Sequence, residues 1–214
     1  MALRWTDLTT LERSREFFKL QVAFNRSSHW WRVGTKEEYY FDFDSIVFEP
    51  TRCKVVVEVL LEKIRDFQDP RLHLQPMSYL AFIEKRDGGT VGALQLAGAL
   101  SIRSGIPFCV VRPGKFVLSE RVKTPFVEGV PPNHRLKGES CLIVTDHCST
   151  GDEIIETADN LKTLGAGVIG ALAYTAIGAE IDHDRLTDAG LTLAYCHSLP
   201  EDALAAKEET RPQG

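Results

Sequence analysis

Short apolar runs alternate with segments of helical periodicity along most of the chain. The runs are continuous rather than alternating, which is typical of strands that are buried on both faces. The helical segments repeat their apolar residues at three- and four-residue spacing. We therefore predict the α/β fold class, with a mostly parallel sheet flanked by helices. The predicted strands are residues 80–83, 108–111, 141–144 and 168–174, and the predicted helices are residues 8–24, 51–67, 90–104 and 152–164.

Local signals sharpen these boundaries. Residues 39–44 end in alternating aromatic and acidic side chains, which indicates a strand with one buried face. Pro50 stands where a helix commonly begins, and Gly105 and Gly165 follow two predicted helices where a helix commonly ends. Residues 114–138 have no clear period. A stretch of this length inside a compact domain is usually a functional loop or lid.

Length and composition favour one soluble domain. The chain has 214 residues, of which 43% are hydrophobic and 26% charged, so it can bury one substantial core. We expect an N-terminal region at 1–50, a core at 51–200 and a polar tail at 201–214. The net charge of −5 lacks the cationic excess that non-specific nucleic-acid binding requires. The N-terminus lacks a secretory apolar run, and no segment approaches a membrane span, so we expect a cytoplasmic protein with neither nucleic acid nor membrane as a partner.

The cysteines do not indicate a metal or redox centre. All five are scattered, and no Cys-x-x-Cys pair occurs. We interpret four of them as small buried hydrophobic residues. Cys148 is the exception, because it stands in a segment with functional features.

That segment follows the predicted strand 141–144. The strand ends at Thr145 and Asp146, and the turn 147–151 supplies hydroxyls, a glycine and the amides of a helix start. Such a turn can cradle a phosphate, while an adjacent carboxylate can accept hydrogen bonds from sugar hydroxyls. The residues equally fit an ordinary turn in which Thr150 or Asp152 caps the next helix.

Five segments, in order, resemble the type I phosphoribosyltransferases, above all the orotate enzymes. Residues 141–151 (Cys-Leu-Ile-Val-Thr-Asp-His-Cys-Ser-Thr-Gly) resemble the family's motif for 5-phosphoribosyl-1-diphosphate (PRPP). The resemblance covers roughly 29–199 and implies a type I phosphoribosyltransferase-like fold with a small N-terminal hood. The other segments are 32–34 with 39–42, the diphosphate-loop candidate 85–90, the strand 110–112 and the lid exit 127–129.

The resemblance also implies a reaction and a set of roles. A nitrogenous base, orotate or a related one, would displace diphosphate from PRPP with Mg²⁺ as cofactor, in pyrimidine nucleotide metabolism. Asp146 would hold the ribose and the metal, and Arg112 and Lys115 would neutralise charge on the departing diphosphate. The family is commonly dimeric, so we expect a homodimer. The implied substrate-binding residues are Arg32, Lys85, Arg86, Gly88, Gly89, Thr145, His147, Cys148, Ser149, Thr150 and Gly151.

Several positions depart from the family pattern. Thr145 stands where the first acid of the motif belongs, and Pro113 where the orotate enzymes carry Lys. Asp152 and Glu153 occupy the end of the phosphate loop. Two unit charges about 4 Å apart interact by about 4 kcal/mol at an effective dielectric near 20, so these carboxylates must point outward if the loop binds phosphate. Ile177 replaces the Arg that contacts orotate, which predicts that orotate is a poor substrate.

Other interpretations stay open. The same fold can serve as a non-catalytic sensor of a phosphoribosyl compound or nucleotide, or as a scaffold for association, because function depends on the site. Residues 165–170 have the spelling G-x-G-x-x-G, but they leave a helix and enter a strand, the reverse of a dinucleotide site. We reject a nicotinamide cofactor on that ground. Adjacent His147 and Cys148 lack an orienting acid, so we do not favour a hydrolase.

Overall fold

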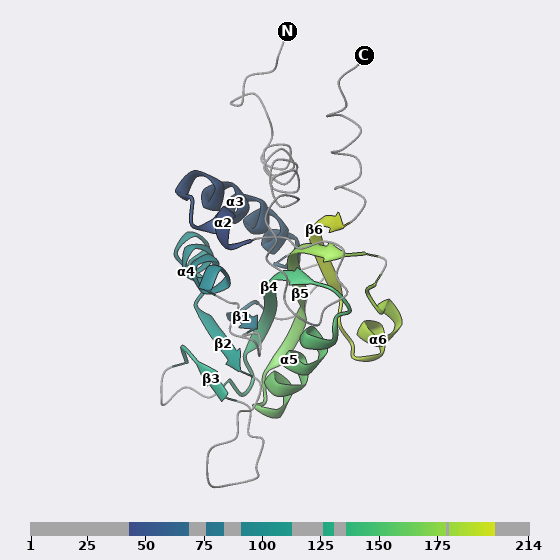
Figure 1. Cartoon of the computed structure of the whole chain (residues 1–214). Helices are drawn as coiled ribbons and strands as arrows, with labels where there is room; N and C mark the ends of the chain where they lie inside the picture. The colour runs from purple at the N-terminus through teal and green to yellow at the C-terminus, as the bar shows by residue number, and fades with distance from the viewer. Residues whose placement is uncertain are drawn as a thin grey trace, which may run out of the picture.

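The computed structural model describes residues 43–68, 76–83, 91–112, 126–130, 136–178 and 180–199. Over these ranges the chain forms a six-stranded sheet with helices on both faces (Figure 1). The strands are β1 Tyr79–Ile83, β2 Phe108–Arg112, β3 Phe126–Glu128, β4 Ser140–Cys148, β5 Gly167–Ile177 and β6 Leu193–Leu199. The helices are α2 Asp44–Val47, α3 Pro50–Phe67, α4 Val91–Ser104, α5 Asp152–Thr163 and α6 His183–Asp188.

The sheet is mostly parallel, as the sequence predicts. Its strand order is β3-β2-β1-β4-β5-β6. Strand β1 pairs in parallel with both β2 and β4, and β5 pairs in parallel with β4 and β6. The short edge strand β3 is antiparallel to β2. The predicted α/β class is confirmed.

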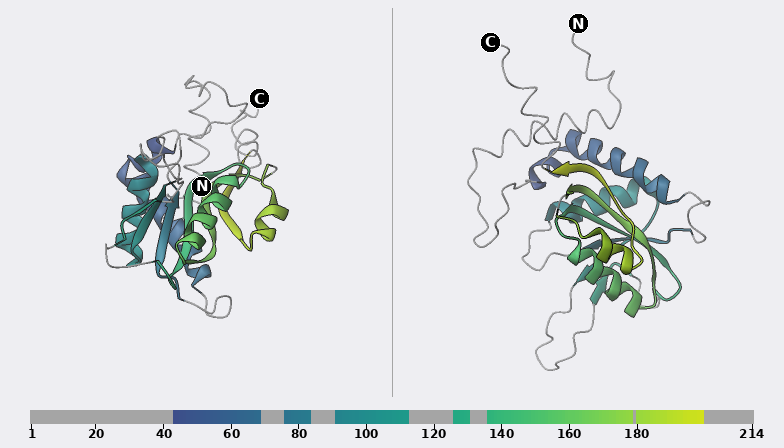
Figure 2. Two further views of the ribbon diagram at one scale, coloured as in Figure 1. Left: turned by 90° about the horizontal axis from the view of Figure 1, so that it is seen from below. Right: turned by 90° about the vertical axis from the view of Figure 1, so that its right-hand side faces the viewer.

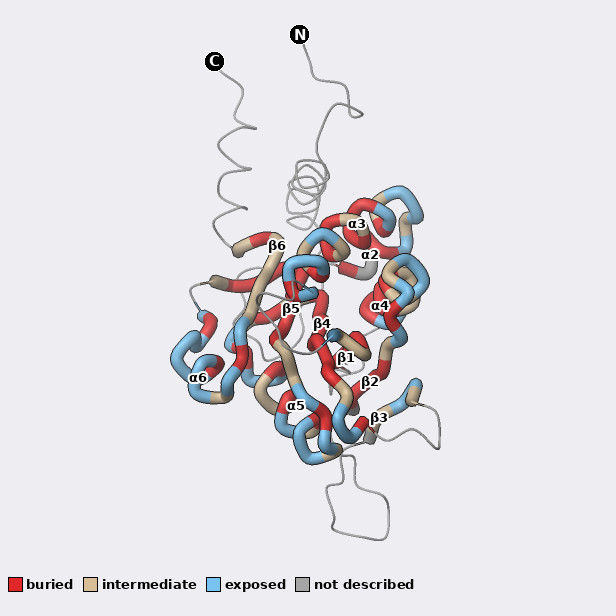
Figure 3. The backbone as a smooth tube through the Cα atoms, turned by 180° about the vertical axis from the view of Figure 1, so that it is seen from behind, coloured by how far each residue is buried: buried red, intermediate tan, exposed pale blue. Residues whose placement is uncertain are grey.

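Two hydrophobic clusters lie on opposite faces of the sheet. In β1, Leu80 and Phe82 join the cluster with α2, α3 and α4, whereas Ala81 and Ile83 join the cluster with α5 and α6. This alternation follows from the two-residue repeat of a strand. Figure 2 shows the helices on the two sides, and Figure 3 shows buried backbone along the central strands. Burial on both faces explains why the strands read as continuous apolar runs.

Helix α3 shows how local sequence positions an element against this core. Glu49 is its N-cap, and the carboxylate accepts the backbone N–H groups of Thr51 at 3.1 Å and Arg52 at 2.8 Å. Both bonds lower the Glu49 pKa. Pro50 occupies the first turn, where a missing N–H costs nothing. The Glu49 cap was not predicted, because Ser, Thr, Asp and Asn are the usual caps.

Some predicted boundaries were wrong. Asp44 begins α2 rather than ending a strand, and residues 39–42 lie outside the described residues. Strand β4 continues through His147 and Cys148, which were assigned to the turn, because both pair with β5. The sequence did not predict α6 or β6. Helix α6 has six residues, and edge strand β6 mixes apolar with polar side chains, so neither gives a clear period.

The predicted helix 8–24 and most of the predicted lid fall outside the described residues. In the part of the chain that is described, no helix has both the length and the hydropathy to cross a membrane.

Candidate functional site

The carboxyl ends of three strands meet at one edge of the sheet. Ile83 at the end of β1 pairs with Val111 of β2, and Phe82 pairs with Val144 of β4. The prediction that these strand ends are neighbours is confirmed. Strand β4 runs four residues beyond its last pairing with β1, and among the described residues this extension pairs with β5 alone. An open pocket lies here, lined by Ile83 and residues 147–154.

A tight bend connects the extension of β4 to α5. Gly151 is the N-cap of α5 and has a φ of 93°, a left-handed conformation that residues with a Cβ rarely adopt. A Cβ built on Gly151 would lie 3.4 Å from Leu186 of α6. The first turn of a helix leaves backbone N–H groups without intrahelical partners, and residues 151–154 of this turn line the pocket. Residues 149–151 therefore form a bend that leads into a helix start, and phosphate binding at this bend stays a prediction.

Asp146 is held firmly just before this bend. Its side chain is buried, and Oδ1 accepts the backbone N–H of His147 at 2.8 Å and lies 3.2 Å from the Thr145 hydroxyl. The Thr145 hydroxyl also lies 3.2 Å from the His147 carbonyl oxygen, so its single proton serves one acceptor at a time. These bonds fix the rotamer of the Asp146 carboxylate. These bonds also occupy the Thr145 hydroxyl, which stands where the resemblance implies the first acid of the PRPP motif.

Strand β5 supports the same segment through Thr175. The Thr175 hydroxyl donates to the Asp146 carbonyl oxygen at 3.1 Å and lies 3.0 Å from His147 Nδ1. A carbonyl cannot donate, so the hydroxyl proton points at Asp146 and the oxygen accepts from His147. His147 therefore carries a proton on Nδ1. The imidazole is half-buried and lines the pocket.

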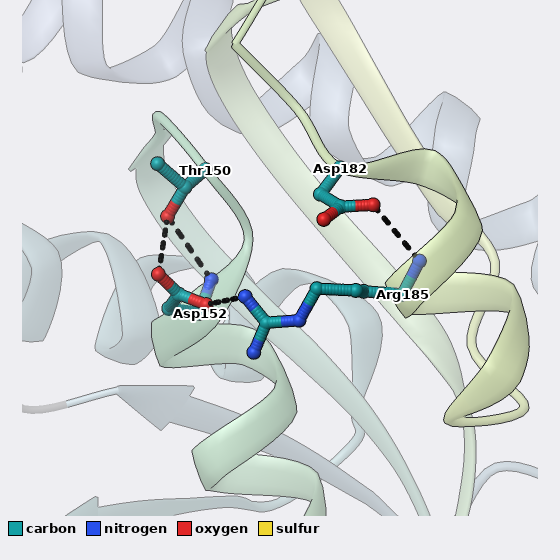
Figure 4. A network of polar contacts seen from close by, with 4 residues as sticks. All are labelled: Thr150, Asp152, Asp182 and Arg185. Carbon is teal, nitrogen blue, oxygen red and sulfur yellow. Dashed lines mark hydrogen bonds and ion pairs between the residues drawn. The ribbon is translucent and has the colours of Figure 1, made fainter.

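The acids at the start of α5 are exposed, as expected. The Asp152 carboxylate accepts the Thr150 hydroxyl at 3.0 Å through Oδ2 and the Arg185 guanidinium at 2.5 Å through Oδ1 (Figure 4). The Thr150 hydroxyl and then Arg185 lower the Asp152 pKa, so this group is a carboxylate at neutral pH. The Thr150 oxygen in turn accepts the Asp152 N–H at 3.3 Å. The carboxylate of Asp152 is thus bound on the side that faces α6.

Cys148, which the sequence set apart from the four predicted core cysteines, is itself buried. Its side chain belongs to the hydrophobic cluster beneath α5. The residue still lines the pocket, as do Ser149 and Thr150. A buried thiol in apolar surroundings has no means of activation, so it is a core residue.

Many predicted site residues cannot be placed. The side chain of Arg112 is not described, although its backbone ends β2 and pairs with Phe126. Ile177, the replacement for an orotate-binding Arg, is buried at the end of β5. The predicted residues that lie outside the described residues are Arg32, Lys85, Arg86, Gly88, Gly89 and Lys115.

The described residues do not form a magnesium site made by the protein alone. No group of three or more His, Cys, Asp and Glu side chains suited to a metal occurs among the described residues. Asp146 is the carboxylate at the end of β4. Magnesium commonly uses one or two protein carboxylates together with substrate phosphates and water. The residues therefore fit a magnesium ion shared with a substrate, rather than one bound by the protein alone.

The glycine-rich segment at 165–170 has a structural role. Gly165 follows α5 with a φ of 84°, and Gly167 and Gly170 lie within β5. The chain there passes from helix to strand, as the sequence predicted, which is the reverse of the context of a dinucleotide site.

Comparisons with known proteins give relatives and structural neighbours of this chain. No family model matches the sequence. The orotate phosphoribosyltransferase of Pyrococcus horikoshii is 28% identical over 137 residues, which are 64% of this chain and 63% of that protein. The hypoxanthine/guanine phosphoribosyltransferase of Methanothermus fervidus is 29% identical over 124 residues, 56% of this chain and 62% of that protein. The match thus spans less than two thirds of the length of these relatives.

Solved structures agree with these relatives. The orotate phosphoribosyltransferase of Aeropyrum pernix has a TM-score of 0.64 at 23% identity, over 83% of this chain and 89% of that one. The Mycobacterium tuberculosis orotate enzyme in complex with PRPP has a TM-score of 0.63 at 18% identity, over 91% and 99%. The fold is that of the type I phosphoribosyltransferases. The resemblance seen in the sequence is confirmed, and the orotate phosphoribosyltransferases are among the relatives of this chain.

Proposed function

We propose that this protein binds PRPP at the end of β4 and transfers its ribose 5-phosphate to a nitrogenous base, releasing diphosphate. One observation carries the proposal: the fixed Asp146 carboxylate stands three residues before the bend at residues 149–151, which leads into a helix start. A carboxylate can accept hydrogen bonds from the hydroxyls of a ribose 5-phosphate, and the amides of a helix start can donate to its phosphate. The relatives supply the class of reaction, because orotate and hypoxanthine/guanine phosphoribosyltransferases both match the chain.

The 5-phosphate would bind at the bend. Backbone N–H groups in the first turn of α5 would donate to the phosphate oxygens, and the helix dipole would favour the negative charge. Ser149 is half-buried and lines the pocket, so its hydroxyl can add a hydrogen bond. Gly151 lets the backbone approach a ligand closely.

Asp146 would bind the ribose. Its carboxylate is held by His147 and Thr145, so little conformational freedom is lost when sugar hydroxyls donate to it. The same carboxylate would share a magnesium ion with oxygens of the substrate. When bound, that ion would neutralise negative charge on the diphosphate.

The reaction is a displacement at the anomeric carbon. A nitrogen lone pair of the base forms the new bond to this carbon, and the bond to the diphosphate oxygen breaks with its electron pair leaving on the diphosphate. The sugar gains oxocarbenium character as that bond breaks, so positioning and electrostatics would supply most of the catalysis. Arg112 and Lys115 stay our candidates for neutralising the departing diphosphate.

The end of β5 argues against orotate as the preferred base. A carboxylate in a partly dry pocket requires a charged or strongly donating partner, ideally an Arg. Ile177 at this strand end is buried and apolar. We therefore propose a base without a carboxylate. The hypoxanthine/guanine relatives make an oxopurine the first candidate.

A non-catalytic sensor of PRPP or a nucleotide is the second candidate. Thr145 supports it, because a neutral hydroxyl stands where the family has an acid and is bonded within the protein. Both candidates require the ligand to bind at the same place. They differ only in whether a base releases diphosphate.

The first test is titration calorimetry of the whole chain with PRPP and Mg²⁺. We expect binding, and we expect it to weaken in Asp146→Asn but not in Asp159→Asn, a matched loss of an exposed carboxylate on α5. Absence of PRPP binding to the unchanged protein would reject both the enzyme and the sensor of PRPP. The proposed homodimer and cytoplasmic location stay predictions, and light scattering of the purified protein tests the former.

A further inference from the structure

The bend at residues 149–151, called the phosphate bend from here on, is followed directly by a negatively charged residue. Asp152 is the first residue of α5 and directly follows Gly151, and its lowered pKa keeps it charged. A carboxylate in the first turn of a helix is attracted to the same N–H groups and the same end of the dipole as a phosphate. Left to itself, this side chain would compete with the 5-phosphate for the bend.

Helix α6 is docked against the bend at three points. The Asp182 N–H donates to the Thr150 carbonyl oxygen at 3.2 Å, and Leu186 packs beside Gly151. The Asp182 side chain caps α6 by accepting the N–H of Arg185 at 3.0 Å. Arg185 is thereby placed opposite Asp152, and Figure 4 shows its guanidinium reaching across to that carboxylate.

We propose that Arg185 is a positioning residue of the phosphate bend. It holds the Asp152 carboxylate toward α6 with the help of the Thr150 hydroxyl, and so keeps this negative charge away from the phosphate of a ligand. The inference rests on the proposed function, because it names the device that lets an acidic bend accept an anionic substrate. It also explains how the chain tolerates an acid at this position.

The pair does little for the stability of the fold. Both side chains have 57% of their surface exposed, and exposed ion pairs contribute little to folding. Loss of Arg185 therefore leaves the protein folded, and its effect is visible in ligand binding. If Arg185 acts through Asp152, that effect depends on the charge of Asp152. If Arg185 instead contacts the phosphate, the effect is independent of Asp152.

A double-mutant cycle separates these cases. Calorimetry with PRPP and Mg²⁺, and separately with inorganic phosphate, is carried out on the unchanged chain, Arg185→Gln, Asp152→Asn and the double variant. We expect Arg185→Gln to weaken PRPP binding about tenfold, and by less than about threefold when Asp152→Asn is already present. Asp152→Asn alone binds at least as tightly as the unchanged chain. The control is Arg103→Gln, an exposed arginine in the last turn of α4, the helix that precedes β2.

Three results would overturn the inference about Arg185. An equal loss from Arg185→Gln in both backgrounds overturns the inference and makes Arg185 a direct ligand of the phosphate. An unchanged affinity in Arg185→Gln, or a loss matched by Arg103→Gln, overturns it in favour of a surface ion pair. If the unchanged chain binds neither PRPP nor phosphate, the proposed function fails, and the inference fails with it. Melting temperatures of the five proteins check that all remain folded.

Discussion

The Thr175 hydroxyl on β5 donates a hydrogen bond to the Asp146 carbonyl oxygen on β4, at 3.1 Å. Thr175 is fully buried, and its hydroxyl oxygen accepts from His147 Nδ1 at 3.0 Å. One side chain thus ties the end of β4 to its neighbouring strand. The position of the Asp146 carboxylate depends on this tie.

Thr175→Val tests that dependence. Valine keeps the shape but removes the hydroxyl, so we expect a loss of about 1–3 kcal/mol in the free energy of unfolding, the cost of removing one partner from buried hydrogen bonds. PRPP binding weakens as well. Urea denaturation and calorimetry measure the two effects, with Thr175→Ser as the control that keeps the hydroxyl. Equal unfolding free energies and equal PRPP affinities in the valine and serine variants would show that the Thr175 hydroxyl does not position Asp146.

Asp146→Asn separates charge from shape. The asparagine oxygen can still accept from His147 and Thr145, so the free energy of unfolding changes little even though the residue is buried. The missing charge weakens binding of PRPP with Mg²⁺ by about tenfold or more, because charge-assisted hydrogen bonds are the strong ones. Calorimetry measures the change. Undiminished affinity would place the ribose elsewhere.

Gly151→Ala is expected to damage binding more than folding. An alanine at positive φ costs about 1–2 kcal/mol. Gly138 has a φ of 85° and open space around a built Cβ, so Gly138→Ala carries the same conformational cost away from the bend. We predict similar losses of unfolding free energy in the two variants, but weaker PRPP binding in Gly151→Ala alone. Equal binding in both would mean that the bend does not contact the phosphate.

The lowered pKa of Asp152 predicts a small pH effect on stability. The native pKa lies below the ordinary value of 3.8, so the stabilisation is present above that value and is lost as the pH falls through the native pKa. The unfolding free energies of the unchanged chain and Asp152→Asn should therefore converge between about pH 5 and pH 2. Urea titrations over this range measure the difference. A gap that widens on acidification would show that Thr150 and Arg185 do not stabilise the charged form.

Orotate should be a poor acceptor. The buried Ile177 offers no charge to the carboxylate of orotate. The orotate-dependent absorbance change with PRPP and Mg²⁺ is the assay, and hypoxanthine and guanine are the comparison bases. Orotate turnover in the ordinary enzyme range of about 1–10³ s⁻¹ would refute this prediction.

Sequence reasoning located most core elements because their signals are local. Gly105 and Gly165 end α4 and α5 as expected, each with a positive φ that suits glycine. The end of β4 was misplaced because Thr145, Asp146 and His147 look like turn residues. Their strand conformation comes from pairing with β5, a segment distant in the sequence.

The candidate site likewise has parts that the sequence predicts and a part that it does not. The bend at 149–151 and Asp146 could be recognised from adjacent residues. Arg185 could not, because it lies 33 positions from Asp152 in the sequence, on a six-residue helix without a readable period. The contact exists only because α6 docks beneath the bend, which is a consequence of the tertiary fold.

Diphosphate release is the most direct measurement of the central claim. The whole chain is incubated with PRPP, Mg²⁺ and one base at a time from a panel of hypoxanthine, guanine, adenine, uracil and orotate, and diphosphate and nucleotide are quantified together. We predict base-dependent release of diphosphate with one nucleotide formed for each, by one of the bases without a carboxylate, and its loss in Asp146→Asn. PRPP binding with no base-dependent release from any member of the panel would contradict transfer and support the sensor.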